Sequence, residues 1–172
     1  MNKHVLRIAY AGLQDHTDIK RSSGAPFFTA QALEDQGCQI HVVTHSQLSR
    51  LRFNKALNKV LPLTGVSWRM PEERSGNIAR RMADDIARQV NGGDIDVVFS
   101  TSSIPMALLR SHLPKAFYAD CTFIDLLEDY PELANYPSQW RDEGHDLEHA
   151  ALHNCDMAIY NSEWEAHSAI DH

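Results

Sequence analysis

Arg21-Ser22-Ser23-Gly24-Ala25-Pro26 is the stretch of the chain that is most informative about its fold. This stretch follows an apolar run over residues 5–11 and precedes a helical pattern over residues 27–36. Proline suits the first turn of a helix, and glycine permits a close backbone approach or a positive φ. The sequence therefore predicts a strand, a loop and a helix whose first turn offers free N–H groups to a phosphate or another oxygen-rich ligand. An ordinary helix cap is the alternative interpretation of the same residues.

The alternation of strand and helix patterns continues along the chain. It predicts an α/β fold, a Rossmann-like parallel sheet with helices on both faces. Short apolar and β-branched runs predict strands at residues 5–11, 38–44, 66–70, 95–100, 116–119 and 157–160. Apolar residues at helical spacing predict helices at residues 27–36, 46–63, 75–90, 123–128 and 139–154, with a short one at Pro105 and a last one that opens at Ser162.

The composition limits the classes of function. The 172 residues match the length of one domain, so residues 1–172 are expected to form a single Rossmann-like domain. The 23 Asp and Glu residues outnumber the 16 Lys and Arg residues, giving a net charge of −7. An acidic chain disfavours general nucleic-acid binding, which requires neutralisation of phosphates. Three widely spaced cysteines, without CxxC spacing, and no signal or membrane-spanning pattern at the N-terminus favour a reduced, cytoplasmic setting.

Polar residues follow four of the predicted strands. In open parallel sheets, ligands bind outside the carboxyl ends of the strands. Hydroxyl and carboxylate groups there suit a polyhydroxyl or phosphate-bearing ligand, although small polar residues also serve ordinary strand-to-helix turns. The four groups are Ser22-Ser23-Gly24, Thr101-Ser102-Ser103, Asp120-Cys121-Thr122 and Asn161-Ser162-Glu163.

Two common nucleotide-binding motifs are missing from the sequence. A dinucleotide fingerprint needs G-x-G-x-x-G directly after the first strand and an acid near the end of the second. Here Gly12 stands alone and the second strand ends at Thr44-His45, which argues against NAD. The P-loop pattern G-x-x-x-x-G-K-[ST] does not occur either. No cofactor is therefore expected.

Several segments occur in an informative order. The early ones are Ser23-Gly24-Ala25-Pro26-Phe27-Phe28, Ala32-Leu33-Glu34-Asp35-Gln36-Gly37 and Ile40-His41-Val42-Val43-Thr44. The later ones are Asp96-Val97-Val98-Phe99-Ser100, Tyr118-Ala119-Asp120-Cys121-Thr122-Phe123, and Glu148 through Asn161-Ser162-Glu163-Trp164. In this order and spacing they resemble the N-terminal half of GT-B glycosyltransferases of the large retaining group, glycosyltransferase family 4. The resemblance covers nearly the whole chain.

The resemblance implies a two-domain enzyme of which this chain is one half. In such enzymes the N-terminal domain mainly holds the acceptor, and the C-terminal domain holds the sugar nucleotide and carries a paired-glutamate motif. The expected function is transfer of a sugar from a nucleotide-sugar donor to a hydroxyl of a sugar or lipid-linked acceptor, without a catalytic metal. The last helix reaches His172 without a stop signal, so the C-terminal donor domain is expected to be absent and the chain alone to be inactive.

The resemblance also implies roles for particular residues. Ser23 and Gly24 are expected in the loop that meets the donor diphosphate across the cleft. Asp120, with Thr122, falls at the strand end where many relatives place an active-site histidine, so Asp120 is the expected catalytic residue. Its carboxylate could accept a hydrogen bond from a sugar hydroxyl, orient the acceptor, or cap the following helix. Ser102 and Ser162, at two other strand ends, complete the expected substrate-binding set.

Other features have a structural and a functional interpretation. His145, His149 and His153 share one helical face, which favours a solvated or interface-facing stripe over a metal site. The basic segment 50–59 is interpreted as a surface helix, with peripheral membrane contact as the alternative. Cys121 lacks an evident activating partner in sequence, so it is not expected to be a nucleophile.

Two alternative functions and one surface follow from the sequence. A non-enzymatic module that binds a sugar or a phosphorylated metabolite, and a sugar-nucleotide epimerase of the same two-domain architecture, are the alternatives. If a second half is missing, an apolar or aromatic patch is expected where it would dock, and the chain could form a homodimer through that patch.

Overall fold

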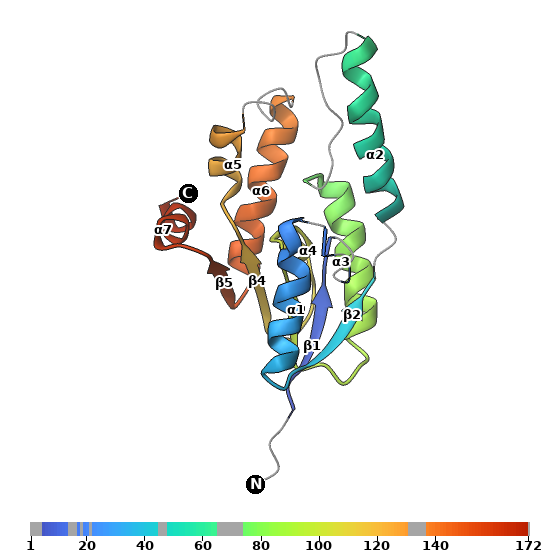
Figure 1. The fold of residues 1–172 in the computed structure, drawn as a ribbon, viewed down its shortest axis with the longest axis vertical. Coiled ribbons are helices and arrows are strands. Elements are labelled where there is room, and N and C mark those ends of the chain that lie inside the picture. Colours follow the sequence, from blue (N-terminus) through green and yellow to red (C-terminus); the bar gives the residue numbers. More distant parts are fainter. Residues whose placement is uncertain are drawn as a thin grey trace.

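Five parallel strands form the sheet of this Rossmann-like α/β fold (Figure 1). The structure is a computed structural model that describes residues 5–13, 17, 19–20, 22–44, 48–64, 74–130 and 137–171. The strands are β1 (Arg7–Ala11), β2 (Gln39–Val43), β3 (Val97–Ser100), β4 (Lys115–Ala119) and β5 (Met157–Tyr160). Their order across the sheet is β2-β1-β3-β4-β5. The chain therefore reverses its direction of travel across the sheet between β1 and β3, and this reversal creates a switch point.

The helices fall where the hydrophobic patterns predict them. They are α1 (Ala25–Asp35), α2 (Leu48–Val60), α3 (Gly76–Val90), α4 (Ile104–Ala107), α5 (Phe123–Asp129), α6 (Ser138–Asn154) and α7 (Glu163–Asp171), with 3-10 turns η1 (Ser22–Gly24) and η2 (Leu61–Thr64). Helix α1 begins at Ala25, two residues before the predicted start, and Pro26 lies in its first turn. The strand predicted at residues 66–70 lies outside the described residues.

Helices cover both faces of the sheet, as predicted (Figure 1). Side chains of successive strand residues point to opposite faces. On one face, Ile8, Tyr10 and Phe99 pack with Ala30 of α1. On the other face, the larger core joins residues of β1, β3 and β4 to helices α3, α4 and α6. The predicted stripe of α3 is buried in that core, as Ile78, Met82, Ile86 and Val90.

The β5 end of the sheet is thinly covered. Three of the four β5 residues are exposed, and α7, which follows β5, has no buried residue. The large apolar side chains exposed on these two elements are Met157, Ile159, Trp164 and Ile170. Exposed apolar side chains are thus present on β5 and α7, and the docking patch expected from the sequence stays a prediction. Within the described parts of the chain, the helices are too short or too polar to cross a membrane.

Candidate functional site

The loop between β1 and α1 has an uncommon backbone. Ser22, Ser23 and Gly24 follow one another with φ values of 43°, 54° and 82°. Positive φ is uncommon for residues other than glycine, and such strain concentrates at functional sites. A Cβ at Gly24 would lie 2.9 Å from an atom of the Phe28 ring and 3.2 Å from the Ile19 carbonyl oxygen. Glycine is therefore required at position 24 on both conformational and steric grounds.

Tyr10 anchors the start of α1 to the sheet. Its hydroxyl donates a 2.8 Å hydrogen bond to the carbonyl oxygen of Pro26. Burial raises the pKa of Tyr10 to about 12, and a hydrogen bond with Thr101 acts in the opposite direction. This tyrosine therefore stays protonated near neutral pH and holds the first turn of α1 against β1.

The first turn of α1 is open to a ligand. Gly24 is the N-cap residue, and among the described residues no side chain caps the helix. The unpaired N–H groups of a helix start carry a partial positive charge. Ala25 and Pro26 of this turn line a pocket of ≈140 Å³.

This pocket lies at the carboxyl ends of β1, β3 and β4. It therefore includes the switch point between β1 and β3, where ligands bind in open α/β sheets. Its described lining residues carry four hydroxyl groups and one carboxylate, and among them the carboxylate is the single formal charge. They are Leu13, Ser22, Ala25, Pro26, Thr101, Ser102, Tyr118 and Asp120.

Asp120 stands at the exposed end of β4, next to the pocket's tyrosine. Burial, and then the Asp120 carboxylate, raise the pKa of Tyr118. Asp120 directly follows β4, and its side chain forms a hydrogen bond with the Tyr118 side chain. The pair places a carboxylate acceptor next to a hydroxyl donor.

The following helix is capped by Thr122 and not by Asp120. The Thr122 hydroxyl accepts a 3.2 Å hydrogen bond from the Asp125 backbone N–H and donates one of 2.6 Å to the Asp125 carboxylate. Capping was one of the three roles that the sequence left open for Asp120. Because Thr122 supplies the cap of α5, the Asp120 carboxylate is left to face the pocket.

Ser102 contributes to the pocket through a turn that organises the loop after β3. Its hydroxyl accepts a 3.3 Å hydrogen bond from the Ile104 N–H, and its own N–H donates to the Ser100 hydroxyl at 3.1 Å. These local bonds define the direction of the Ser102 side chain at the pocket wall. A hydroxyl keeps further donor and acceptor capacity after one such bond.

Ser162 caps the last helix. Its hydroxyl accepts a 3.2 Å hydrogen bond from the Glu165 N–H and donates one of 2.9 Å to the Glu165 carboxylate. Ser162-Glu163-Trp164-Glu165 has the S-x-x-E form of a capping box, but here the glutamate side chain meets the serine hydroxyl and not the serine backbone N–H.

The structure brings together part of the predicted set of site residues. Ser102 and Asp120 line the same pocket, while Ser23 and Gly24 lie in the adjoining loop. Thr122 and Ser162 are not among the pocket's lining residues. Tyr118 was not singled out from the sequence, although its position two residues before Asp120 on a predicted strand is a signal that could have identified it.

A buried polar network centred on Glu148 connects the loops that follow β3 and β4. Glu148 of α6 is 5% exposed and accepts hydrogen bonds from the Phe123 N–H and, at 3.3 Å, from the Ser103 hydroxyl. The Arg74 guanidinium lies 3.7 Å from the same carboxylate and 4.4 Å from the centre of the Phe123 ring. One helix residue thereby joins the loops that follow β3 and β4.

Cys121 and the histidines of α6 show no arrangement suited to catalysis or metal binding in the described residues. Burial raises the pKa of the Cys121 thiol to about 11, so this thiol is protonated at neutral pH and a poor nucleophile. The rings of His149 and His153 lie 4.4 Å apart, and Nδ1 of His153 contacts the His149 carbonyl oxygen at 2.9 Å. In the described part of the chain, no three His, Cys, Asp or Glu side chains come together as a metal site.

Comparisons of the chain with protein families, curated proteins and solved structures found no match.

Proposed function

We propose that this chain is the acceptor-side domain of a glycosyltransferase and that the strand-end pocket binds a hydroxyl-rich part of the acceptor. The observation that carries the proposal is the convergence of four hydroxyl groups and the Asp120 carboxylate on one pocket at the switch point. Sugar hydroxyls both donate and accept hydrogen bonds, so they pair well with such a lining. The order of the motifs along the chain, which resembles the GT-B N-terminal half, supports the same proposal.

Asp120 is proposed to hold and orient the acceptor hydroxyl. A carboxylate accepts hydrogen bonds more strongly than a neutral group, and orientation of a reacting hydroxyl lowers the barrier to transfer. The Tyr118 hydroxyl, next to Asp120, is proposed to contact a neighbouring sugar oxygen. The open start of α1, which also lines the pocket, suits the negative charge of the donor diphosphate.

The size of the pocket supports a half-site. Its ≈140 Å³ is smaller than the roughly 300 Å³ of most small-molecule pockets. A second surface is then needed to enclose both substrates and to neutralise the leaving diphosphate. We therefore propose that the chain binds acceptor weakly by itself and transfers sugar only with a donor-binding domain.

The proposal is tested by NMR titration of the ¹⁵N-labelled chain with methyl α-D-glucopyranoside and myo-inositol as neutral polyols. We expect the chemical-shift changes that either polyol causes to be largest at residues 101–102 and 118–120. Asp120→Asn should weaken binding by about tenfold, because a hydrogen bond to a charged group is worth roughly 1.5 kcal/mol or more. Asp129→Asn is the matched control, since this exposed carboxylate lies at the end of α5.

Two results would contradict the proposal. One is the absence of shifts at residues 101–102 and 118–120 with either polyol at high concentration. The other is an equal loss of affinity in Asp120→Asn and Asp129→Asn. The half-site is examined separately, by incubation with UDP-glucose and the same polyols: product formation by the chain alone would show that no second domain is needed.

A further inference from the structure

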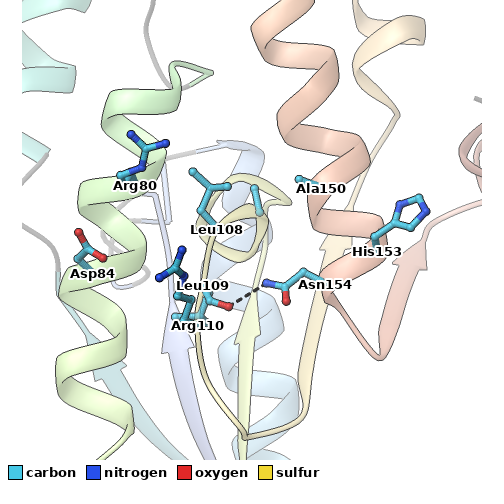
Figure 2. A pocket seen from close by; sticks show the side chains of 9 residues that line it. Arg80, Asp84, Leu108, Leu109, Arg110, Ala150, His153 and Asn154 are labelled. Carbon is cyan, nitrogen blue, oxygen red and sulfur yellow. Dashed lines mark hydrogen bonds between the residues drawn. The ribbon is translucent and has the colours of Figure 1, made fainter.

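A second and larger pocket lies between α3 and α6, on the face of the sheet that these helices cover (Figure 2). Its volume is ≈490 Å³, within the range of small-molecule sites. Helix α3 contributes one wall, the C-terminal part of α6 the other, and the segment after α4 lies between them. The lining includes Arg80, Asp84, Leu108, Arg110, His153 and Asn154. None of these residues belongs to the strand-end site.

Two arginines line this pocket without an ion-pair partner among the described residues. Arg80 comes from α3 and Arg110 from the segment after α4, and both are exposed. Asp84, one turn after Arg80 on the same helix, forms no described ion pair with either of them. Two cationic groups from separate elements therefore line one concave surface of a chain whose net charge is −7.

Some other arginines of the described chain are paired with carboxylates, whereas Arg81 and Arg141 form no described ion pair. Arg88, also on α3, contacts the Asp85 carboxylate. Arg7 contacts Asp94 at 3.0 Å and Asp96 at 3.3 Å. Arg80 and Arg110 are distinguished by their position, because they line the same pocket from two separate elements.

The rest of the pocket lining combines apolar side chains, among them Leu108, with the polar side chains of His153 and Asn154. Leu108 projects into the space between the two helices in Figure 2, and the His153 ring points away from the arginines. The Asn154 side-chain amide donates hydrogen bonds to the carbonyl oxygens of Met106 at 2.7 Å and Leu109 at 2.9 Å. These bonds fasten the end of α6 to the segment after α4, so the pocket has a preformed wall.

We propose that this pocket binds a small phosphomonoester with an apolar body. Guanidinium groups bind phosphate oxygens through paired hydrogen bonds, and two of them match the double charge of a phosphomonoester. The apolar part of the ligand would lie on Leu108. This site is separate from the acceptor pocket. Its ligand is therefore a second one, which takes no part in the proposed transfer reaction.

Phenyl phosphate is the probe, with inorganic phosphate and phenol as its separate parts. In NMR titrations of the ¹⁵N-labelled chain, we expect phenyl phosphate to shift signals of residues around 80, 108 and 110, and to bind more tightly than either part. Arg80→Gln and Arg110→Gln should each weaken binding by about tenfold. Arg88→Gln, which removes an equal charge from α3 outside the pocket, should leave the affinity nearly unchanged.

Asp84→Asn gives a result of the opposite sign. Removal of a carboxylate from the pocket lining should strengthen binding of a dianion, because like charges repel. All four substitutions are at partly or fully exposed side chains, and thermal unfolding checks that each variant folds. The proposal is overturned if phenyl phosphate binds no better than phosphate and phenol, or if Arg88→Gln weakens binding as much as Arg80→Gln and Arg110→Gln do. It is also overturned if Asp84→Asn weakens binding.

Discussion

At the scale of single residues, the loop before α1 shows how local backbone chemistry prepares a site. Three successive residues, Ser22 to Gly24, take positive φ values, and the hydroxyl of Tyr10 holds the helix that follows. The strained loop places the open start of α1 next to the hydroxyl groups that follow β3.

Gly24→Ala should destabilise the chain more than Gly37→Ala. Both glycines have positive φ, 82° and 86°, so each alanine incurs a backbone cost of about 1–2 kcal/mol. At position 24 the new Cβ also meets the Phe28 ring and the Ile19 carbonyl oxygen, whereas at position 37 nothing lies within 4 Å. Urea unfolding of the two variants measures the difference, and equal losses would show that the steric part of this account is wrong.

Asp120→Asn should lower the pKa of the Tyr118 hydroxyl. The nearby carboxylate disfavours the phenolate, and its neutralisation removes that repulsion, while burial still keeps the pKa above its ordinary value. Because the folded-state pKa is raised, the stability that neutral Tyr118 contributes is present below about pH 10 and is lost as the pH rises through the folded-state pKa. The variant should therefore lose less stability than the parent in alkaline solution.

The measurement is an NMR titration of ¹³C-labelled tyrosine rings, with Tyr118→Phe to assign the signal. Asp129→Asn serves again as the control and should leave the Tyr118 titration in place. An unchanged Tyr118 titration in Asp120→Asn would mean that the two side chains do not interact in solution.

At the scale of elements, the packing of α6 against α5 explains why α6 contains an interior glycine, a residue that helix propensity disfavours. An interior glycine costs a helix about 1 kcal/mol relative to alanine. Gly144 is nevertheless buried in α6, where a Cβ would overlap the Phe123 ring of α5. One turn further along, the Glu148 carboxylate accepts the Phe123 N–H. Helix α6 thus positions the loop that carries Asp120 through two contacts with Phe123. Gly144 leaves space for the Phe123 ring, and Glu148 binds the Phe123 backbone N–H.

Gly144→Ala should destabilise the chain by about 1–3 kcal/mol, despite the higher helix propensity of alanine, because overpacking at the Phe123 contact dominates. Gly92→Ala is the control: position 92 is exposed with no atom within 4 Å, so its effect should stay within about 0.5 kcal/mol. Chemical unfolding followed by circular dichroism gives both values. A Gly144→Ala variant as stable as the parent would mean that the Phe123 ring can move aside.

At the scale of the whole molecule, the sheet has two unlike ends. Strand β2 stands at one end of the order and β5 at the other. Met157 and Ile159 are exposed on β5, and Trp164 and Ile170 on the following helix. Edge strands with exposed apolar residues tend to pair with another chain. The homodimer expected from the sequence stays a prediction, and β5 is the edge at which it is most directly tested.

Ile159→Lys should shift the chain toward monomer in sedimentation experiments at high protein concentration, because a charge on the β5 edge opposes pairing. Val42→Lys, at an exposed position on β2, is the matched control and should leave association unchanged. A parent chain that sediments as a monomer at every concentration would contradict the homodimer, as would equal effects of the two lysines.

Much of the fold could be predicted because its signals are local and periodic. The stripe of α3 and the alternating strands depend on which residues lie on one side of an element, and that is a property of spacing alone. The polar strand ends could be identified as a group for the same reason. Glu148 could not be placed from spacing, since its partners Ser103 and Phe123 lie on other segments, whereas the spacing of Tyr118 from Asp120 could have identified Tyr118.

The sequence by itself therefore determined the α/β class, the succession of strands and helices along the chain, and the residues that end the strands. Only the tertiary structure decided that Ser22, Ser102 and Asp120 share a pocket, that Thr122 and not Asp120 caps α5, and that Arg80 and Arg110 line a second pocket. The physical reason is the distance along the chain over which each kind of interaction acts. Periodicity and capping act over a few residues of chain, whereas a pocket depends on the strand order and helix packing that bring distant segments together.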